Sequence, residues 1–120
     1  MMVKDQLLKE FLAKKSAHSI LLFEELNTAF QQIGKVSFHS TKTMIAFSAR
    51  INFAYIIQMG KDFIDIVFPF KEVYEDNLCF RKIKQVPGSS DYNHHIRIYA
   101  KEDLNEEVKG YMRKAYENGL

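Results

Sequence analysis

The chain has 120 residues, of which 47% are hydrophobic and 27% charged, so we expect a single globular domain over residues 1–120. The formal net charge of +2 is too small to indicate, by itself, binding to nucleic acid or to an anionic membrane. The lone Cys79 cannot form an internal disulfide, and no segment has the ~18 consecutive apolar residues of a membrane helix. The N-terminus lacks the apolar centre of a signal peptide, so we expect a soluble cytoplasmic protein.

Residues 3–15 have the spacing of an amphipathic helix. Their apolar side chains share one face: Leu7, Leu8, Phe11 and Leu12. The pattern predicts an N-terminal helical extension, residues 1–15, that packs on the domain. A homodimer contact through this helix is the alternative.

Residues 20–33 predict a second helix. The apolar residues repeat at helical spacing: Leu22, Phe23, Leu26, Phe30 and Ile33. Ser16 or Ser19 would cap the start of this helix, and Gly34 would end it in a left-handed conformation.

A region of predicted strands follows. Residues 36–39 alternate and suggest an edge strand, whereas residues 44–48 and 51–58 are apolar at successive positions, which is typical of a sheet centre. Residues 63–68 predict the third strand of a meander, and Pro69 would end its pairing. The predicted core comprises Phe30, Ile45, Phe47, Phe53, Ile56 and Ile66.

The second half of the chain adds strands over residues 78–86 and 94–99, separated by a loop at residues 87–91. Asp103 and Glu106 have the spacing of a capping box that would begin a closing helix. The order of elements predicts an α+β fold. Its antiparallel sheet has about five or six strands, with a meander core, and is packed by an N-terminal helix pair and a C-terminal helix.

Three segments and the closing helix carry a resemblance to a known family. They are Thr41-Lys42-Thr43-x-Ile45-Ala46-Phe47, Asn52-Phe53-Ala54, His94-His95-x-Arg97 and the helix end near Ala115-Tyr116. Together they resemble the family catalogued as domain of unknown function 5655, over residues 18–117. The resemblance implies a small α+β domain related to frataxin-like folds. Members occur alone or fused to other uncharacterised or nuclease-like domains, and some are labelled "predicted transport protein". No established catalytic residue or cofactor follows from the resemblance.

The favoured function is a non-catalytic binding or interaction module with an anion site formed by Lys42, His95 and Arg97. Alternation along residues 94–99 places His95 and Arg97 on the same face of the sheet. If the strand after Lys42 were a neighbour of the strand that carries His95, the Lys42 ammonium group would lie beside His95 and Arg97. The positive charges of the cluster would then lower the pKa of His95 and attract an anion. The alternative for Lys42 is a solvated side chain whose stem covers apolar surface.

Arg81, Lys82 and Lys84 form the only basic run. Basic residues near aromatic ones on a sheet can bind single-stranded nucleic acid, which gives a second hypothesis, a nucleic-acid accessory domain. The alternative is that these charges protect the edge of a sheet against aggregation, which is a more frequent role for charges on one strand than nucleic-acid binding.

A small enzyme with a histidine-centred site is the third hypothesis. His94 and His95 are adjacent in a strand and point to opposite faces, so a metal site would need His39 or Asp65 as well. No sequence motif for a catalytic triad or a phosphate-binding loop is present, and we predict no catalytic residue, cofactor or metal.

Overall fold

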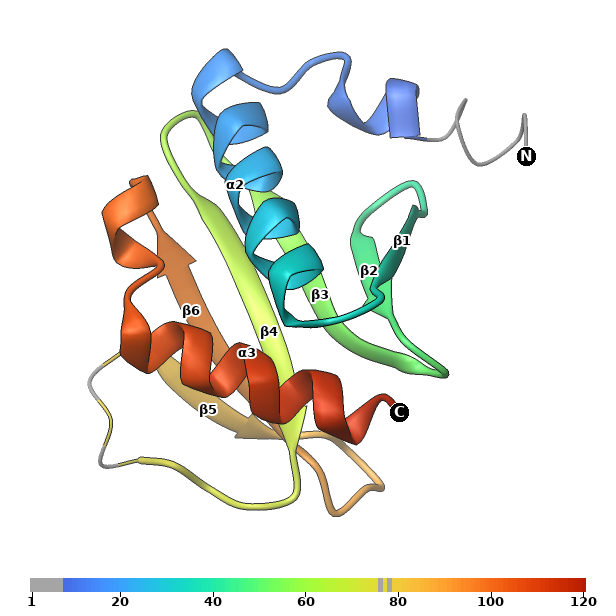
Figure 1. Cartoon of the computed structure of the whole chain (residues 1–120), viewed down its shortest axis with the longest axis vertical. Coiled ribbons are helices and arrows are strands. Elements are labelled where there is room, and N and C mark those ends of the chain that lie inside the picture. The colour runs from blue at the N-terminus through green and yellow to red at the C-terminus, as the bar shows by residue number, and fades with distance from the viewer. Residues whose placement is uncertain (1–7, 76, 78) are drawn as a thin grey trace.

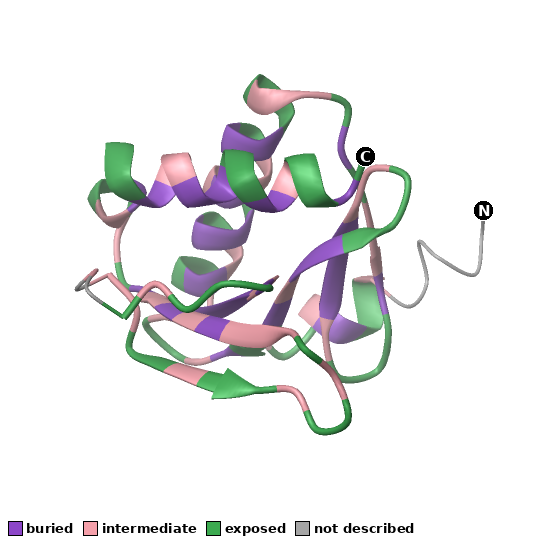
Figure 2. Cartoon of the chain, turned by 90° about the horizontal axis from the view of Figure 1, so that it is seen from below, coloured by how far each residue is buried: buried purple, intermediate pink, exposed green. Residues whose placement is uncertain are grey.

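A computed structural model describes residues 8–75, 77 and 79–120 of the chain (Figure 1). Six antiparallel strands form one sheet in the order β1-β2-β3-β4-β6-β5, and helices α2 and α3 lie on the same side of it (Figures 1 and 2). The elements in chain order are α2 (Ala17–Ile33), β1 (Ser37–Ser40), β2 (Ile45–Ser48), β3 (Asn52–Met59), β4 (Ile64–Phe70), β5 (Lys82–Gln85), β6 (Tyr92–Ile98), the short 3-10 helix η1 (Lys101–Asp103) and α3 (Glu106–Asn118). The predicted α+β class and antiparallel sheet are confirmed.

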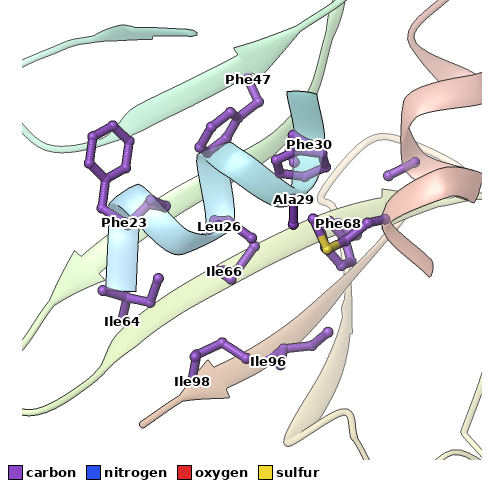
Figure 3. Packing of buried hydrophobic residues seen from close by; sticks show 14 of the residues in the cluster. Phe23, Leu26, Ala29, Phe30, Phe47, Ile64, Ile66, Phe68, Ile96 and Ile98 are labelled. Atoms are coloured by element: carbon purple, nitrogen blue, oxygen red, sulfur yellow. The ribbon is translucent and has the colours of Figure 1, made fainter. Parts of the chain in front are cut away.

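The core lies between the sheet and the two helices. Side chains from α2 and from alternate positions of β2, β4 and β6 meet there, as Figure 3 shows. All six predicted core residues are at most 2% exposed: Phe30, Ile45, Phe47, Phe53, Ile56 and Ile66. The rings of Phe30 and Phe47 lie 4.8 Å apart and join α2 to the sheet. Aromatic packing therefore fixes the helix on the sheet.

Helix α2 begins at Ala17, ahead of the predicted range 20–33, and ends at Ile33 as predicted, but the cap at Gly34 differs in conformation. The Ser16 hydroxyl accepts a hydrogen bond from the backbone N–H of Ser19 at 3.0 Å and caps the helix. Gly34 ends the helix with φ of 179°, which is an extended conformation rather than the predicted left-handed one. Its lack of a side chain matters because a Cβ atom there would overlap the ring of Tyr116 from α3. The two helices thus approach closely at Gly34.

Strand β4 continues through Pro69, so the prediction that proline ends its pairing is wrong. Pro69 pairs with Asn93 of β6, while the pairing of β4 with β3 ends at Val67 and Tyr55. Proline is tolerated in a strand where one side has no ladder to complete. Beyond Val67 the β3 side of β4 is such a local edge.

The closing helix uses a different cap from the predicted pair Asp103 and Glu106. The Asn105 side chain accepts a hydrogen bond from the N–H of Val108 at 3.0 Å and caps α3. The Asp103 carboxylate instead accepts from the backbone N–H groups of Tyr99 and Ala100, at 2.8 and 3.1 Å. Asp103 therefore closes the turn between β6 and η1 and does not cap α3.

The predicted N-terminal extension lies partly outside the described residues. Residues 8–12 are helical, and Phe11 is buried against the core with Leu8 and Leu12 beside it. The homodimer contact through this segment stays a prediction. Within the described residues, no helix combines the length and apolar character needed to cross a membrane.

Candidate binding site on the open face of the sheet

The face of the sheet opposite α2 and α3 is called the open face (Figure 2). The strand register places one row of residues across this face, with one residue from each strand in the order His39, Ala46, Tyr55, Val67, His95 and Lys82. The next row on the covered face contains Ile45, Ile56, Ile66 and Ile96. The side chains of the open-face row are therefore the ones that α2 and α3 leave uncovered.

A hollow of about 400 Å³ lies in the middle of the open face. Its lining residues come from β3, β4, β6 and the adjoining turns: Met44, Tyr55, Ile57, Val67, Pro69, Val86, Asp91, Asn93 and His95. Val67 pairs with Tyr55 on one side and with His95 on the other. A small side chain between two larger rings produces the depression, and a volume near 400 Å³ is in the range of small-ligand sites.

His95 is a half-buried imidazole beside the basic edge of the sheet. Burial is the largest cause that lowers its pKa, followed by the positive charge of Lys82, which is its direct neighbour on β5. Asp65 opposes the shift, whereas Lys84 and Arg81 add to it. The lowered pKa has the direction that the sequence predicts, but the charges responsible come from β5 and not from Lys42 or Arg97.

Arg97 is on the same face as His95, as alternation predicts, but Asp65 occupies its guanidinium group. Arg97 donates to the two carboxylate oxygens of Asp65 at 2.7 and 2.9 Å, which raises the pKa of Arg97. The guanidinium carbon lies 3.8 Å from the centre of the Phe63 ring. Arg81 also approaches Asp65 at 3.8 Å. Arg97 therefore acts as a partner of Asp65 rather than as a free cation for a ligand.

Lys42 does not lie beside the other two predicted site residues. It is exposed in the turn between β1 and β2, and strands β3 and β4 separate β2 from β6. The strand after Lys42, β2, is therefore not a neighbour of β6, the strand that carries His95. Neighbouring strands are about 4.8 Å apart, so β2 and β6 are separated by roughly 14 Å.

The basic run occupies the edge of the sheet. Lys82 and Lys84 are exposed on β5, which is the outermost strand beyond β6, and Arg81 precedes it. Lys82 and Lys84 pair with His95 and Asn93, two residues that line the hollow. Edge position agrees with protection against aggregation. The same position puts two ammonium groups at the rim of the hollow.

His94 lies on the covered face and is fully engaged. Its Nδ1 atom donates to the Tyr92 carbonyl at 2.9 Å and its Nε2 atom accepts from the Tyr74 backbone N–H at 3.2 Å. The rings of Phe70, Tyr74 and Phe80 surround it, with centroids 5.0, 5.5 and 4.9 Å away. Burial lowers the pKa of His94, so the imidazole is neutral and structural.

The other candidates for catalysis or metal binding are held apart or inactivated. His39 lies on β1, four strands from His95, and Asp65 is paired with Arg97. No group of three or more His, Cys, Asp or Glu side chains that could hold a metal ion occurs among the residues that the structure describes. Burial, together with Glu107, raises the pKa of the Cys79 thiol to about 11, so it is protonated at neutral pH.

Sequence reasoning missed Tyr55, Val67 and Asn93 as members of a site. Residues 51–58 predict a strand that is apolar on both faces, so Tyr55 is expected within a sheet centre and not as part of a ligand surface. The alternation of small and large side chains across strands is invisible until the register is known. For Asn93, the available signal was its position two residues before His95, on the same face.

The fold and the hollow define the class of the protein: a small α+β domain with helices on one face of an antiparallel sheet and a lined depression in the other. A family model described as "Domain of unknown function (DUF5655)" matches residues 8–119. The chain therefore belongs to this family. The match begins before His18, where the resemblance seen in the sequence starts. Comparisons with curated proteins and with solved structures found no match.

Proposed function

We propose that the protein is a non-catalytic binding domain that takes an anionic ligand on the open face, at His95 and the neighbouring Lys82. The observation that carries the proposal is the hollow over Val67, which borders the basic strand β5. Of the three binding residues predicted from the sequence, His95 retains this role, while Lys82 and Lys84 replace Lys42 and Arg97.

Electrostatics supports an anion at this place. The charge of Lys82 is felt by His95, since it lowers the pKa of that imidazole. Both ammonium groups of β5 are exposed and unshielded by Asp65, whose oxygens accept from Arg97. An anion held between His95 and Lys82 would gain from both charges, because protonated imidazole and ammonium both donate to phosphate or carboxylate oxygens.

A catalytic role has less support from the same geometry. His94 has both ring nitrogens engaged by backbone groups, and the Asp65 carboxylate is bound by Arg97. General acid–base catalysis requires a group free to exchange a proton with a substrate. Of His94, His95 and Asp65, only His95 meets that condition. The carboxylate that lines the hollow, Asp91, is paired with Lys71 at 3.3 Å.

The test is an NMR titration of the His95 imidazole with and without inorganic phosphate at constant ionic strength. Bound phosphate stabilises the protonated ring, so the pKa of His95 should rise when phosphate is added. Lys82→Met should abolish or strongly reduce this rise. Lys42→Met is the matched control, because it removes the same charge from the turn between β1 and β2 and should leave the rise intact. A rise lost in Lys42→Met and kept in Lys82→Met would overturn the proposal.

A further inference from the structure

Two rings, those of Tyr55 and His95, border the hollow, and the space between them is called the slot. Tyr55 and His95 both line it, and each pairs with Val67 from opposite sides. With about 4.8 Å between neighbouring strands, the backbones that carry the two rings are roughly 10 Å apart. Contact between non-bonded carbon atoms occurs at about 3.5–4.0 Å, so a flat ring between two others needs roughly 7–8 Å. The spacing therefore suits one planar group inserted between Tyr55 and His95.

The floor and the end of the slot differ in chemistry. Val67, which is 3% exposed, and Pro69 form an apolar floor. Asn93 lies in the next row of the open face and presents an amide with both donor and acceptor atoms. Such a group can hydrogen-bond to the edge of a heteroaromatic ring whose faces lie against Tyr55 and His95. An aliphatic anion would leave this apolar and aromatic surface unused.

Two lysines stand on the β5 side of the slot, whereas the row on the β3 side carries no lysine or arginine. Lys82 pairs with His95 and Lys84 pairs with Asn93, so both ammonium groups stand at the β5 edge. On the β3 side, the row continues through Tyr55 to Ala46, which has no charge. A ligand that fits both parts has a planar ring at one end and an anionic group about one strand spacing away.

We infer that the open face binds a nucleotide, with its base between Tyr55 and His95 over Val67 and its phosphate at Lys82 and Lys84. This inference rests on the proposed anion site and adds the class of ligand. A base in the slot leaves its sugar-phosphate directed toward the basic edge. The same chemistry is presented by a free nucleotide and by one residue of a single strand. In the second case Lys84 and Arg81 would bind the flanking phosphates.

The experiment compares three ligands by isothermal titration calorimetry at one ionic strength: inorganic phosphate, ribose 5-phosphate and adenosine 5′-monophosphate. Stacking of one base on an aromatic side chain should make the nucleotide bind roughly tenfold tighter than ribose 5-phosphate. Tyr55→Leu should lower the affinity for the nucleotide to that for ribose 5-phosphate and leave the affinity for inorganic phosphate unchanged. Tyr99→Leu is the matched control, since Tyr99 contacts Phe63 and lies outside the hollow. The Tyr99→Leu variant should still bind the nucleotide roughly tenfold tighter than ribose 5-phosphate.

The outcomes separate this inference from the proposed function. Equal affinities for the nucleotide and ribose 5-phosphate would overturn the nucleotide inference and leave the anion site standing. Absence of binding by all three ligands would overturn both. If Tyr55→Leu does not fold, Val67→Ile takes its place, because the added methylene on the floor makes the slot shallower. This variant should lower the affinity for the nucleotide and leave that for ribose 5-phosphate unchanged.

An oligoadenylate of six residues identifies the source of the nucleotide. A single-strand site predicts tighter binding than the mononucleotide, with a steep salt dependence that flattens in Lys84→Ala. A free-nucleotide site predicts equal affinity per site for the two ligands. Either result retains the slot between Tyr55 and His95. If the six-residue oligoadenylate binds equally well to wild type and to Tyr55→Leu, binding of a base between Tyr55 and His95 is contradicted.

Discussion

The two faces of the sheet are built from alternating residues of the same strands, yet they obey different requirements. The covered row runs Ile45, Ile56, Ile66 and Ile96, and each of these side chains is at most 2% exposed. The open row of the same strands mixes small, aromatic and ionisable residues, and it continues on β5 with the cationic Lys82. Burial against α2 and α3 selects the first row for shape and hydrophobicity. The second row is free of that constraint, so its unusual residues are the informative ones for function.

The largest expected difference between the faces is in stability. Phe47→Ala removes a ring that contacts Phe23 and Phe30 on the covered face, and should lower the free energy of unfolding by roughly 3–5 kcal/mol. Tyr55→Ala, on the open face, should cost clearly less because its ring is half exposed. Urea denaturation of the two variants measures the contrast. A Phe47→Ala protein with unchanged unfolding would show that β2 is misplaced.

The two adjacent histidines should differ in how they link stability to pH. The pKa of His94 is lowered in the folded state, so above pH ~6.5, the ordinary value, it is neutral in both states. Below that pH the unfolded chain binds the proton first, and the free energy of unfolding decreases until the pH falls below the lowered pKa. His94→Phe should flatten this decrease. It should also cost roughly 1–3 kcal/mol at pH 8, because the Tyr74 N–H loses its acceptor.

His95→Gln provides the comparison for His94→Phe. The pKa of His95 is lowered as well, so part of the slope below pH 6.5 should disappear in this variant. Its stability at pH 8 should change little, since His95 is half exposed on the open face. Equal losses at pH 8 for the two histidine variants would contradict the assignment of His94 to the covered face.

The smallest expected effects concern the ion pairs of the open face. Asp65→Asn weakens the two hydrogen bonds to Arg97 in a site where the aspartate side chain is only 10% exposed. Asp91→Asn breaks the pair with Lys71, whose side chain is 80% exposed, and should change the free energy of unfolding by less than about 1 kcal/mol. Thermal unfolding should therefore show a larger decrease for Asp65→Asn. The reverse order would mean that Arg97 is available to a ligand.

The sequence alone was sufficient for the covered face. Helical spacing in α2, the densest apolar strands and the alternation along β6 identified the core and placed His95 and Arg97 on one face. These patterns are local, because each depends on residues a few positions apart. The capping of α3 by Asn105 and the continuation of β4 through Pro69 were missed, since both depend on contacts that sequence spacing does not show.

The candidate site depends on strand order, which is not local. Lys42 and Arg97 both carry the charge that an anion site requires. However, β3 and β4 lie between β2, which follows the Lys42 turn, and β6, which carries Arg97, and Asp65 binds Arg97. Lys82 becomes the neighbour of His95 only because β5 pairs with β6 at the edge. Charge along the chain therefore led to the hypothesis of an anion site, and the register changes which cations lie beside His95 in the proposed site.

The most direct test of the central claim, that the open face is the binding surface, is a map of backbone amide shifts on addition of phosphate. We predict that the largest changes occur at residues 82–84 and 93–95, with smaller ones near Tyr55 and Val67. The covered face and residues 41–43 should remain unperturbed. Largest changes at residues 41–43, around Lys42, or no changes at any concentration of phosphate, would contradict it.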